Sequence, residues 1–201
     1  MIEIEKNFDL KPGDKERLIA GARFLKKKTF TDIYYDNDVY NLTGRDFWLR
    51  TRDGRFELKV PLNDAHIGDR KTDRYRELET DAEITRELGF AIKTNFTDAL
   101  AEAKYKPFAT ITTTRETYEK GDFHLDFDEM DFGFVTFEAE LMVGGESEIA
   151  DAERRILKFA KEHGIAGNEG HGKVIEYIAR NRPAHYAALV ARGVIYPHIN
   201  V

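Results

Sequence analysis

The sequence predicts an α+β fold in which an antiparallel β-barrel, closed or half-closed, is covered by amphipathic helices. In four or more segments, apolar and polar residues alternate with the period of a β-strand that has one buried face. Short turn sequences such as Asp53-Gly54 join neighbouring segments and favour antiparallel hairpins. Three or four further segments carry apolar stripes of helical period, which can cover the apolar faces of the strands.

The chain has 201 residues, 41% of them hydrophobic and 34% charged, which suits one globular domain over residues 1–201. The net charge of −6 gives no overall field that would attract nucleic acid. The absence of cysteine excludes disulfides and thiolate zinc sites. Without an apolar run of membrane-spanning length or a signal peptide, we expect a cytoplasmic protein with no membrane partner.

The first third of the chain predicts a strand, a helix and a second strand. Residues 2–8 alternate so that Glu3 and Glu5 share one face of a strand. A short helix is expected at residues 14–22. Residues 29–35 are β-branched and aromatic, which favours a strand.

Residues 47–61 predict a hairpin with one apolar and one charged face. Gly54 tolerates the positive φ that a two-residue type I′ turn requires, and this turn sets the register. On the charged face the expected pairs are Arg52 with Arg55, Arg50 with Glu57, and Trp48 with Lys59. An ordinary solvated face is the alternative for such a hairpin. The charged face gains significance because other strands repeat the pattern.

The rest of the chain predicts strands and helices that follow the same logic. We expect a surface loop at residues 63–73. Further strands are expected at residues 74–80, 108–118, 123–129 and 134–143. Helices are expected at residues 81–88, 95–104, 148–163, 173–181 and 185–192, and those from about residue 173 should pack on the barrel.

The charged faces of these strands, taken together, predict a cavity for a polyanion and a divalent cation. A cavity that holds many charges is costly unless a ligand, water or ions fill it. Arginine and lysine bind phosphate oxygens, whereas carboxylates at alternate strand positions suit Mg²⁺ or Mn²⁺. Neither a P-loop nor an HExxH zinc motif is present.

Several short motifs resemble those of the CYTH (triphosphate tunnel metalloenzyme) superfamily, in the same order along the chain. They are Glu3-Ile4-Glu5, LRTR, ELK, RELE, Arg115, the Asp126 hairpin and EAE at residues 138–140. The sequences IYYD, DFGF and KVIEYIARNRPAHY are similar to the thiamine-triphosphatase branch, and the likeness spans residues 2–186. The resemblance implies a closed eight-stranded antiparallel tunnel with flanking helices. It also implies divalent-metal-dependent hydrolysis of a triphosphate inside the tunnel.

The resemblance implies roles for individual residues. The metal-binding carboxylates would be Glu3, Glu5, Asp126, Glu138 and Glu140, with Glu77 as a further helper. The phosphate-binding side chains would be Arg50, Arg52, Lys59, Arg115 and Lys173. Tyr34 would activate water, with Lys59 and Arg115 also catalytic; ordinary strand packing is the alternative for Tyr34. Trp48 is a candidate for binding the organic end of a substrate, or else a packing residue.

One position departs from the family motif. The lysine of the ExExK signature is replaced by Asn7, and Lys6 lies on the opposite face of the strand. Three explanations compete: a slower enzyme or a different substrate, a bulge that brings Lys6 into the site, or a protein that binds polyphosphate without cleaving it. We expect a Mg²⁺- or Mn²⁺-dependent hydrolase of thiamine triphosphate or inorganic triphosphate, a monomer or weak dimer. A binding module and an adenylate cyclase are the alternatives.

Overall fold

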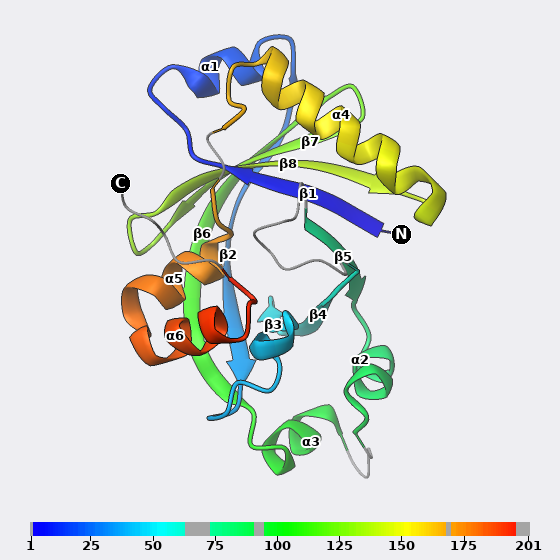
Figure 1. Cartoon of the computed structure of the whole chain (residues 1–201), viewed down its shortest axis with the longest axis vertical. Helices are drawn as coiled ribbons and strands as arrows, with labels where there is room; N and C mark the ends of the chain where they lie inside the picture. The colour runs from blue at the N-terminus through cyan, green and yellow to red at the C-terminus, as the bar shows by residue number, and fades with distance from the viewer. Residues whose placement is uncertain (1, 63–72, 91–94, 168–169, 196–201) are drawn as a thin grey trace.

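In the part of the chain that the structure describes, eight antiparallel strands form a closed barrel and six α-helices lie around it (Figure 1). The computed structural model describes residues 2–62, 73–90, 95–167 and 170–195. The strands are β1 (Ile2–Phe8), β2 (Arg23–Asp36), β3 (Trp48–Arg52), β4 (Arg55–Pro61), β5 (Asp73–Leu78), β6 (Lys106–Lys120), β7 (Phe123–Met130) and β8 (Val135–Val143). Around the barrel they follow the order β1-β5-β4-β3-β2-β6-β7-β8. The predicted eight-stranded barrel is therefore confirmed.

The helices surround the barrel and also close part of it. They are α1 (Asp14–Ile19), α2 (Asp81–Leu88), α3 (Phe96–Glu102), α4 (Ile149–Glu162), α5 (Lys173–Asn181) and α6 (Pro183–Ala191), with short 3₁₀ turns at Thr43–Arg45 and Glu146–Glu148. No helix in the described ranges has the length and apolar character needed to span a membrane. The loop expected at residues 63–73 falls almost entirely outside the described residues, and Asp73 already belongs to β5.

The predicted hairpin register is confirmed at the β3–β4 turn. Both turn residues have positive φ, 52° for Asp53 and 79° for Gly54, as a type I′ turn requires. The opposed pairs are Trp48 with Lys59, Arg50 with Glu57, and Arg52 with Arg55. Because paired residues share a face, the charged side chains of this hairpin enter the barrel, while Arg55 is exposed at the turn.

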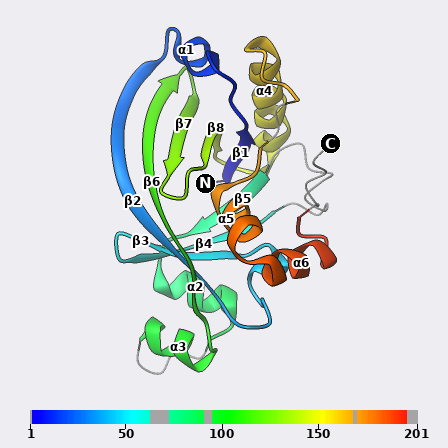
Figure 2. The ribbon, with the colours of Figure 1, turned by 90° about the vertical axis from the view of Figure 1, so that its left-hand side faces the viewer.

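Strands β2 and β6 are longer than the sequence pattern indicated. They have 14 and 15 residues and curve together along one side of the barrel (Figure 2). Lys26, Lys27 and Lys28 pair with Thr117, Glu116 and Arg115. Polar residues on both faces hide the alternation at these ends, so the hydrophobic pattern alone detects only the central part of each strand.

The outer faces of the strands pack against the helices, as predicted. Leu49 and Leu58 of the hairpin share an apolar cluster with Ile84 of α2 and Phe96 of α3. On the other side, Phe159 of α4 packs in a cluster with Phe8, Leu125 and Phe137. These clusters cover the outer face of the barrel, and most of its inner face carries polar and charged side chains.

Helix α5 closes one end of the barrel. Val174 and Ile178 of α5 lie in one buried cluster with Tyr34, Trp48 and Ile111. The three barrel residues belong to the inner face, since Ile111 pairs with Asp32 and Tyr34 with Arg50. The barrel interior therefore has an apolar end that contacts α5, and Lys173 begins that helix.

Candidate functional site

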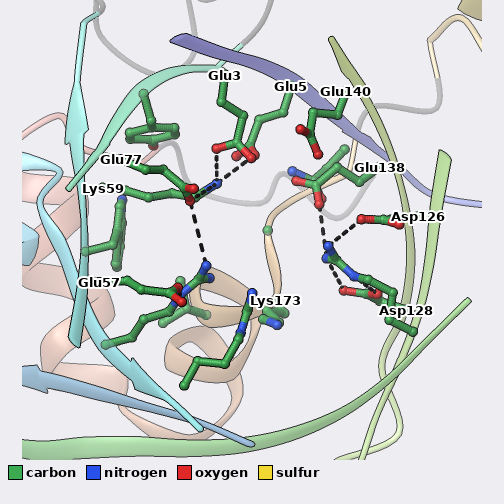
Figure 3. A pocket seen from close by; sticks show the side chains of 18 of the residues that line it. Glu3, Glu5, Glu57, Lys59, Glu77, Asp126, Asp128, Glu138, Glu140 and Lys173 are labelled. Atoms are coloured by element: carbon green, nitrogen blue, oxygen red, sulfur yellow. Dashed lines mark hydrogen bonds and ion pairs between the residues drawn. The ribbon is translucent and has the colours of Figure 1, made fainter. Parts of the chain in front are cut away.

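A cavity of about 440 Å³ lies inside the barrel and is lined by charged residues from all eight strands and from α5 (Figure 3). Every residue that the sequence singled out as a site candidate lines this cavity. These are Glu3, Glu5, Tyr34, Trp48, Arg50, Arg52, Lys59, Glu77, Arg115, Asp126, Glu138, Glu140 and Lys173. The structure therefore brings together side chains from positions 3 to 173 of the chain.

The strand register explains why the carboxylates meet. Glu5 of β1 is opposite Glu140 of β8, and Glu138 of β8 is opposite Asp126 of β7. Directly opposed residues have their side chains about 5 Å apart on one face. Three adjacent strands therefore form an acidic wall, defined here as Glu3, Glu5, Asp126, Asp128, Glu138 and Glu140.

Lys59 is held by the acidic side chains of β1. Its Nζ lies 2.6 Å from Glu3 Oε2, 2.7 Å from Glu5 Oε2 and 3.7 Å from Glu77 Oε1. Although burial opposes it, the charges of Glu3 and Glu5 raise the pKa of Lys59 well above its ordinary value. Lys59 is therefore a permanent cation between the two sides of the cavity.

Arg115 occupies the equivalent position at the other end of the acidic wall. Its Nε and Nη2 donate to Asp128 Oδ1 and Oδ2 at 2.6 and 2.7 Å, in a two-pronged arrangement. Its Nη1 donates to Asp126, and its Nη2 lies 3.2 Å from Glu138 Oε2. Asp128 pairs with Arg115 across β6 and β7, so the sheet register fixes this contact.

Three further cations gather near β2 and β3 and form a basic wall, defined here as Arg50, Arg52 and Lys173. Arg50 Nε donates to Glu57 Oε2 at 2.8 Å. Arg52 and Lys173 both contact Asp32, which is fully buried. The sequence pattern did not select Asp32, because it stands between Phe30 and Tyr34 in a strand that reads as aromatic packing.

The acidic wall carries more negative charge than its cations neutralise. Burial, with the charges of Glu3 and Glu138, raises the pKa of Glu140 to about 8. Burial and the charge of Glu138 likewise raise the pKa of Glu5 well above its ordinary value. A cation placed among these oxygens would favour their ionised forms.

The chemistry of the acidic wall suits a hard divalent cation. Its donors are carboxylate oxygens only, the ligands that Mg²⁺ and Mn²⁺ prefer. Within the described part of the chain, all of these carboxylates except Glu140 contact Lys59 or Arg115, and no three of them already form a ligand cluster. Binding of a cation would therefore require these side chains to turn from their ammonium and guanidinium partners.

The apolar end of the cavity is held in place by Asp46. Trp48 Nε1 and Tyr75 Oη both donate to Asp46 Oδ1, at 2.8 and 3.1 Å. Both rings line the cavity. Tyr34 lies near them beside Arg50, and burial together with the Asp32 charge raises its pKa to about 12.

Asn7 lines the cavity opposite Glu138, as the alternation predicted. The pairing of β1 with β8 runs without interruption from Ile2 to Phe8, so no bulge turns Lys6 into the barrel. The structure therefore excludes the explanation in which Lys6 replaces the missing lysine from its own strand.

Comparisons with known proteins agree with this geometry. A family model described as CYTH domain matches residues 1–171. Thiamine-triphosphatase from Homo sapiens is 29% identical over 94% of this chain and 90% of its own. The solved structure of the PH1819 protein from Pyrococcus horikoshii OT3 has a TM-score of 0.66 and 21% identity, covering 90% of this chain and 99% of that one.

A second solved structure shares the fold at lower similarity. It is a putative adenylyl cyclase from Hippeastrum that is described as having a dominant triphosphatase activity. Its TM-score is 0.54 at 17% identity, covering 89% of this chain and 94% of that one. With a family model that matches most of the sequence and a closed barrel whose interior is charged, this chain belongs to the CYTH domain family.

Proposed function

We propose that this protein is a divalent-metal-dependent triphosphatase that hydrolyses thiamine triphosphate or inorganic triphosphate inside the barrel. The observation that carries the proposal is that an acidic wall and a basic wall face each other across one cavity. A triphosphate needs cations along its oxygens, and a divalent cation bridging to carboxylates completes the charge balance.

The basic residues would bind and orient the triphosphate. Arg50 and Arg52 offer planar guanidinium groups that suit phosphate oxygens, while Lys59, Arg115 and Lys173 offer further charge from other strands and from α5. Because these groups are fixed before binding, they can stabilise charge that develops on the phosphoryl group. Lys173 lies at the start of α5 and lines the cavity, so this helix completes the site. This supports the proposal that the barrel and the C-terminal helices form one functional domain.

The acidic residues would hold the metal. Glu3, Glu5, Asp126, Glu138 and Glu140 are the candidate ligands, with Glu77 nearby. A bound divalent cation supplies neutralisation of phosphate charge and helps to orient the substrate. With its pKa near 12, Tyr34 carries its proton at neutral pH, so it would orient the attacking water by hydrogen bonding.

The organic end of the substrate would lie at the apolar end of the cavity. Trp48 and Tyr75 offer aromatic faces there. The human relative is named as a thiamine-triphosphatase, which supports thiamine triphosphate as one candidate. Inorganic triphosphate needs no aromatic contact and is the other.

A polyphosphate-binding module without turnover is the second candidate, and Asn7 is the observation that favours it. Asn7 can donate a hydrogen bond to phosphate but carries no charge, so a site built around a lysine at this position loses one cation. The adenylate cyclase alternative is separated by its product, because it would release pyrophosphate from ATP.

The test is phosphate release from inorganic triphosphate, thiamine triphosphate and ATP by the wild-type protein and by the Asn7→Lys variant. We expect the wild type to release phosphate from at least one triphosphate. Release by the variant alone would show that the native protein is a binder. If pyrophosphate were the product released from ATP, the adenylate cyclase alternative would replace the proposal of triphosphate hydrolysis.

A further inference from the structure

The inner face of β2 carries a buried carboxylate to which the proposed mechanism gives no part. Asp32 has 0% of its surface exposed and lies between Phe30 and Tyr34, whose side chains enter the cavity. A buried carboxylate is retained at a cost unless cations and hydrogen bonds compensate it. The partners of Asp32 therefore indicate what it does.

Two of the cations that we assign to phosphate binding converge on Asp32. Arg52 donates from Nε to Oδ1 at 2.7 Å and from Nη2 to Oδ2 at 2.9 Å. Lys173 Nζ lies 2.6 Å from Oδ2. The fork uses two of the five N–H donors of the guanidinium, which leaves the others for a ligand.

Phe30 holds the same cations from the other side. Its ring centroid is 4.1 Å from Arg52 Cζ and 4.7 Å from Lys173 Nζ. Arg115 also lies within reach, with Cζ at 5.8 Å. Cations over an aromatic face are stabilised by the ring quadrupole, and more so when water is excluded.

We propose that Asp32, assisted by Phe30, is a positioning residue that holds Arg52 and Lys173 as a preformed pair for binding the phosphate chain. This inference rests on the proposed function. Asp32 is anchored in β2, Arg52 in β3 and Lys173 at the start of α5, so one carboxylate joins three elements at the point where the basic wall forms. Without it, these two like charges would lose the one anion that pairs with both of them.

The charge of Asp32 also determines whether Lys173 keeps its proton. Burial lowers the pKa of Lys173 to about 8. The groups that face Lys173 are Asp32 from β2, Asp128 from β7, Arg115 from β6, and Arg50 and Arg52 from β3. The two anions raise the pKa and the arginines lower it, so loss of the Asp32 charge should move deprotonation of Lys173 to a lower pH.

The test compares Asp32→Asn with Asp36→Asn, a matched change on the same strand. Asp36 is 3% exposed and accepts hydrogen bonds from Leu42 N, Thr43 N and Thr43 Oγ1 outside the cavity, so it controls for the loss of a buried carboxylate. Binding of inorganic tripolyphosphate is measured by calorimetry with EDTA, between pH 6 and 9. The KM and kcat for tripolyphosphate with Mg²⁺ are measured in parallel.

We expect Asp32→Asn to weaken tripolyphosphate binding about tenfold at pH 8 and to raise KM more than it lowers kcat. The difference from wild type should be smaller at pH 6 than at pH 8, because a larger fraction of Lys173 is protonated in the variant at the lower pH. Asp36→Asn should bind like wild type at every pH. Phe30→Leu is the second variant, in case Asp32→Asn fails to fold. It removes the aromatic ring but keeps an apolar side chain, and it should weaken binding about threefold.

The outcomes separate the two proposals. A wild-type protein that binds no tripolyphosphate and releases no phosphate would overturn the proposed function, and this inference with it. A wild type that binds, with Asp32→Asn binding equally well, would overturn the positioning role alone. Unchanged binding by Phe30→Leu would overturn it as well.

Discussion

The acidic and basic walls of the cavity both hold several buried charges of one sign next to fewer charges of the opposite sign. On the acidic wall, the two cations Lys59 and Arg115 hold five of the six carboxylates. On the basic wall, Arg52 and Lys173 are held by the single anion Asp32. In both walls, a few charged side chains hold a larger number of side chains of the opposite sign. The more numerous side chains are then available to bind a ligand.

The comparison shows that each wall is incomplete alone. On the acidic wall, burial and the charges of Glu3 and Glu138 raise the pKa of Glu140 to about 8. On the basic wall, burial lowers the pKa of Lys173 to about 8, although Asp32 and Asp128 oppose that shift. A bound metal would stabilise the ionised groups of the first wall, and a bound triphosphate those of the second. If the acidic wall binds a metal and the basic wall binds phosphate, substitutions in the two walls should have different effects.

The largest effect is expected from a change on the acidic wall. Glu138→Gln keeps the side-chain shape but removes a charge opposite Asp126, so kcat for triphosphate should fall by roughly a thousandfold. Folding should be nearly unaffected. Glu129→Gln on the exposed side of β7 is the control and should retain activity. An active Glu138→Gln protein would remove this residue from the metal set.

The second prediction removes the cation that holds the acidic wall. Arg115→Met leaves Asp126 and Asp128 buried without their partner, so the free energy of unfolding should fall by about 3 kcal/mol. Added Mg²⁺ should restore more stability to the variant than to the wild type, because it replaces the lost charge. Urea unfolding with and without Mg²⁺ measures both. No stabilisation of either protein by Mg²⁺ would contradict a metal site at this wall.

The third prediction concerns the basic wall and pH. The pKa of Lys173 is about 8 in the folded protein and 10.5 when unfolded, so the unfolded state binds more protons between these values. The Lys173 contribution to stability therefore improves as pH rises from 8 to 10.5. Lys173→Met should be more stable than wild type at pH 7, with a free energy of unfolding about 2 kcal/mol higher. This difference in stability should disappear by pH 10.5. A stability difference that stays constant across this pH range would show that the pKa of Lys173 is not lowered in the folded protein.

The smallest effect is expected at the apolar end. Trp48→Leu removes an aromatic face but no charge, so KM for thiamine triphosphate should rise about tenfold while KM for inorganic triphosphate stays the same. The ratio of the two KM values is the measurement. An equal rise for both substrates would place Trp48 in barrel packing alone.

The fold and the cavity were predictable because strand alternation and turn chemistry are local. The Asp53-Gly54 turn set the register of Arg50, Arg52 and Lys59, and the structure confirms it. Asp32 was not predictable in the same way. Its role depends on Arg52 in the next strand and on Lys173 in a helix far along the chain, and no local pattern reports such a meeting.

The ends of β2 and β6 show a second limit. Their lysine and threonine residues alternate between the cavity and the exposed outer face, and both faces are polar there. The hydrophobic period that marks a strand disappears wherever both faces are polar. For Tyr34 and Trp48, the sequence supported a packing role and a site role equally well. In the structure both residues line the cavity, and both also pack in the apolar cluster at its end.

The most direct test of the two-wall account is phosphate release from inorganic triphosphate by the wild-type protein, in Mg²⁺ and in EDTA. The account predicts steady release in Mg²⁺ and none in EDTA, because the basic wall alone binds the substrate without completing the charge balance. Equal release in both conditions would contradict it, since the acidic wall would then have no part in the reaction.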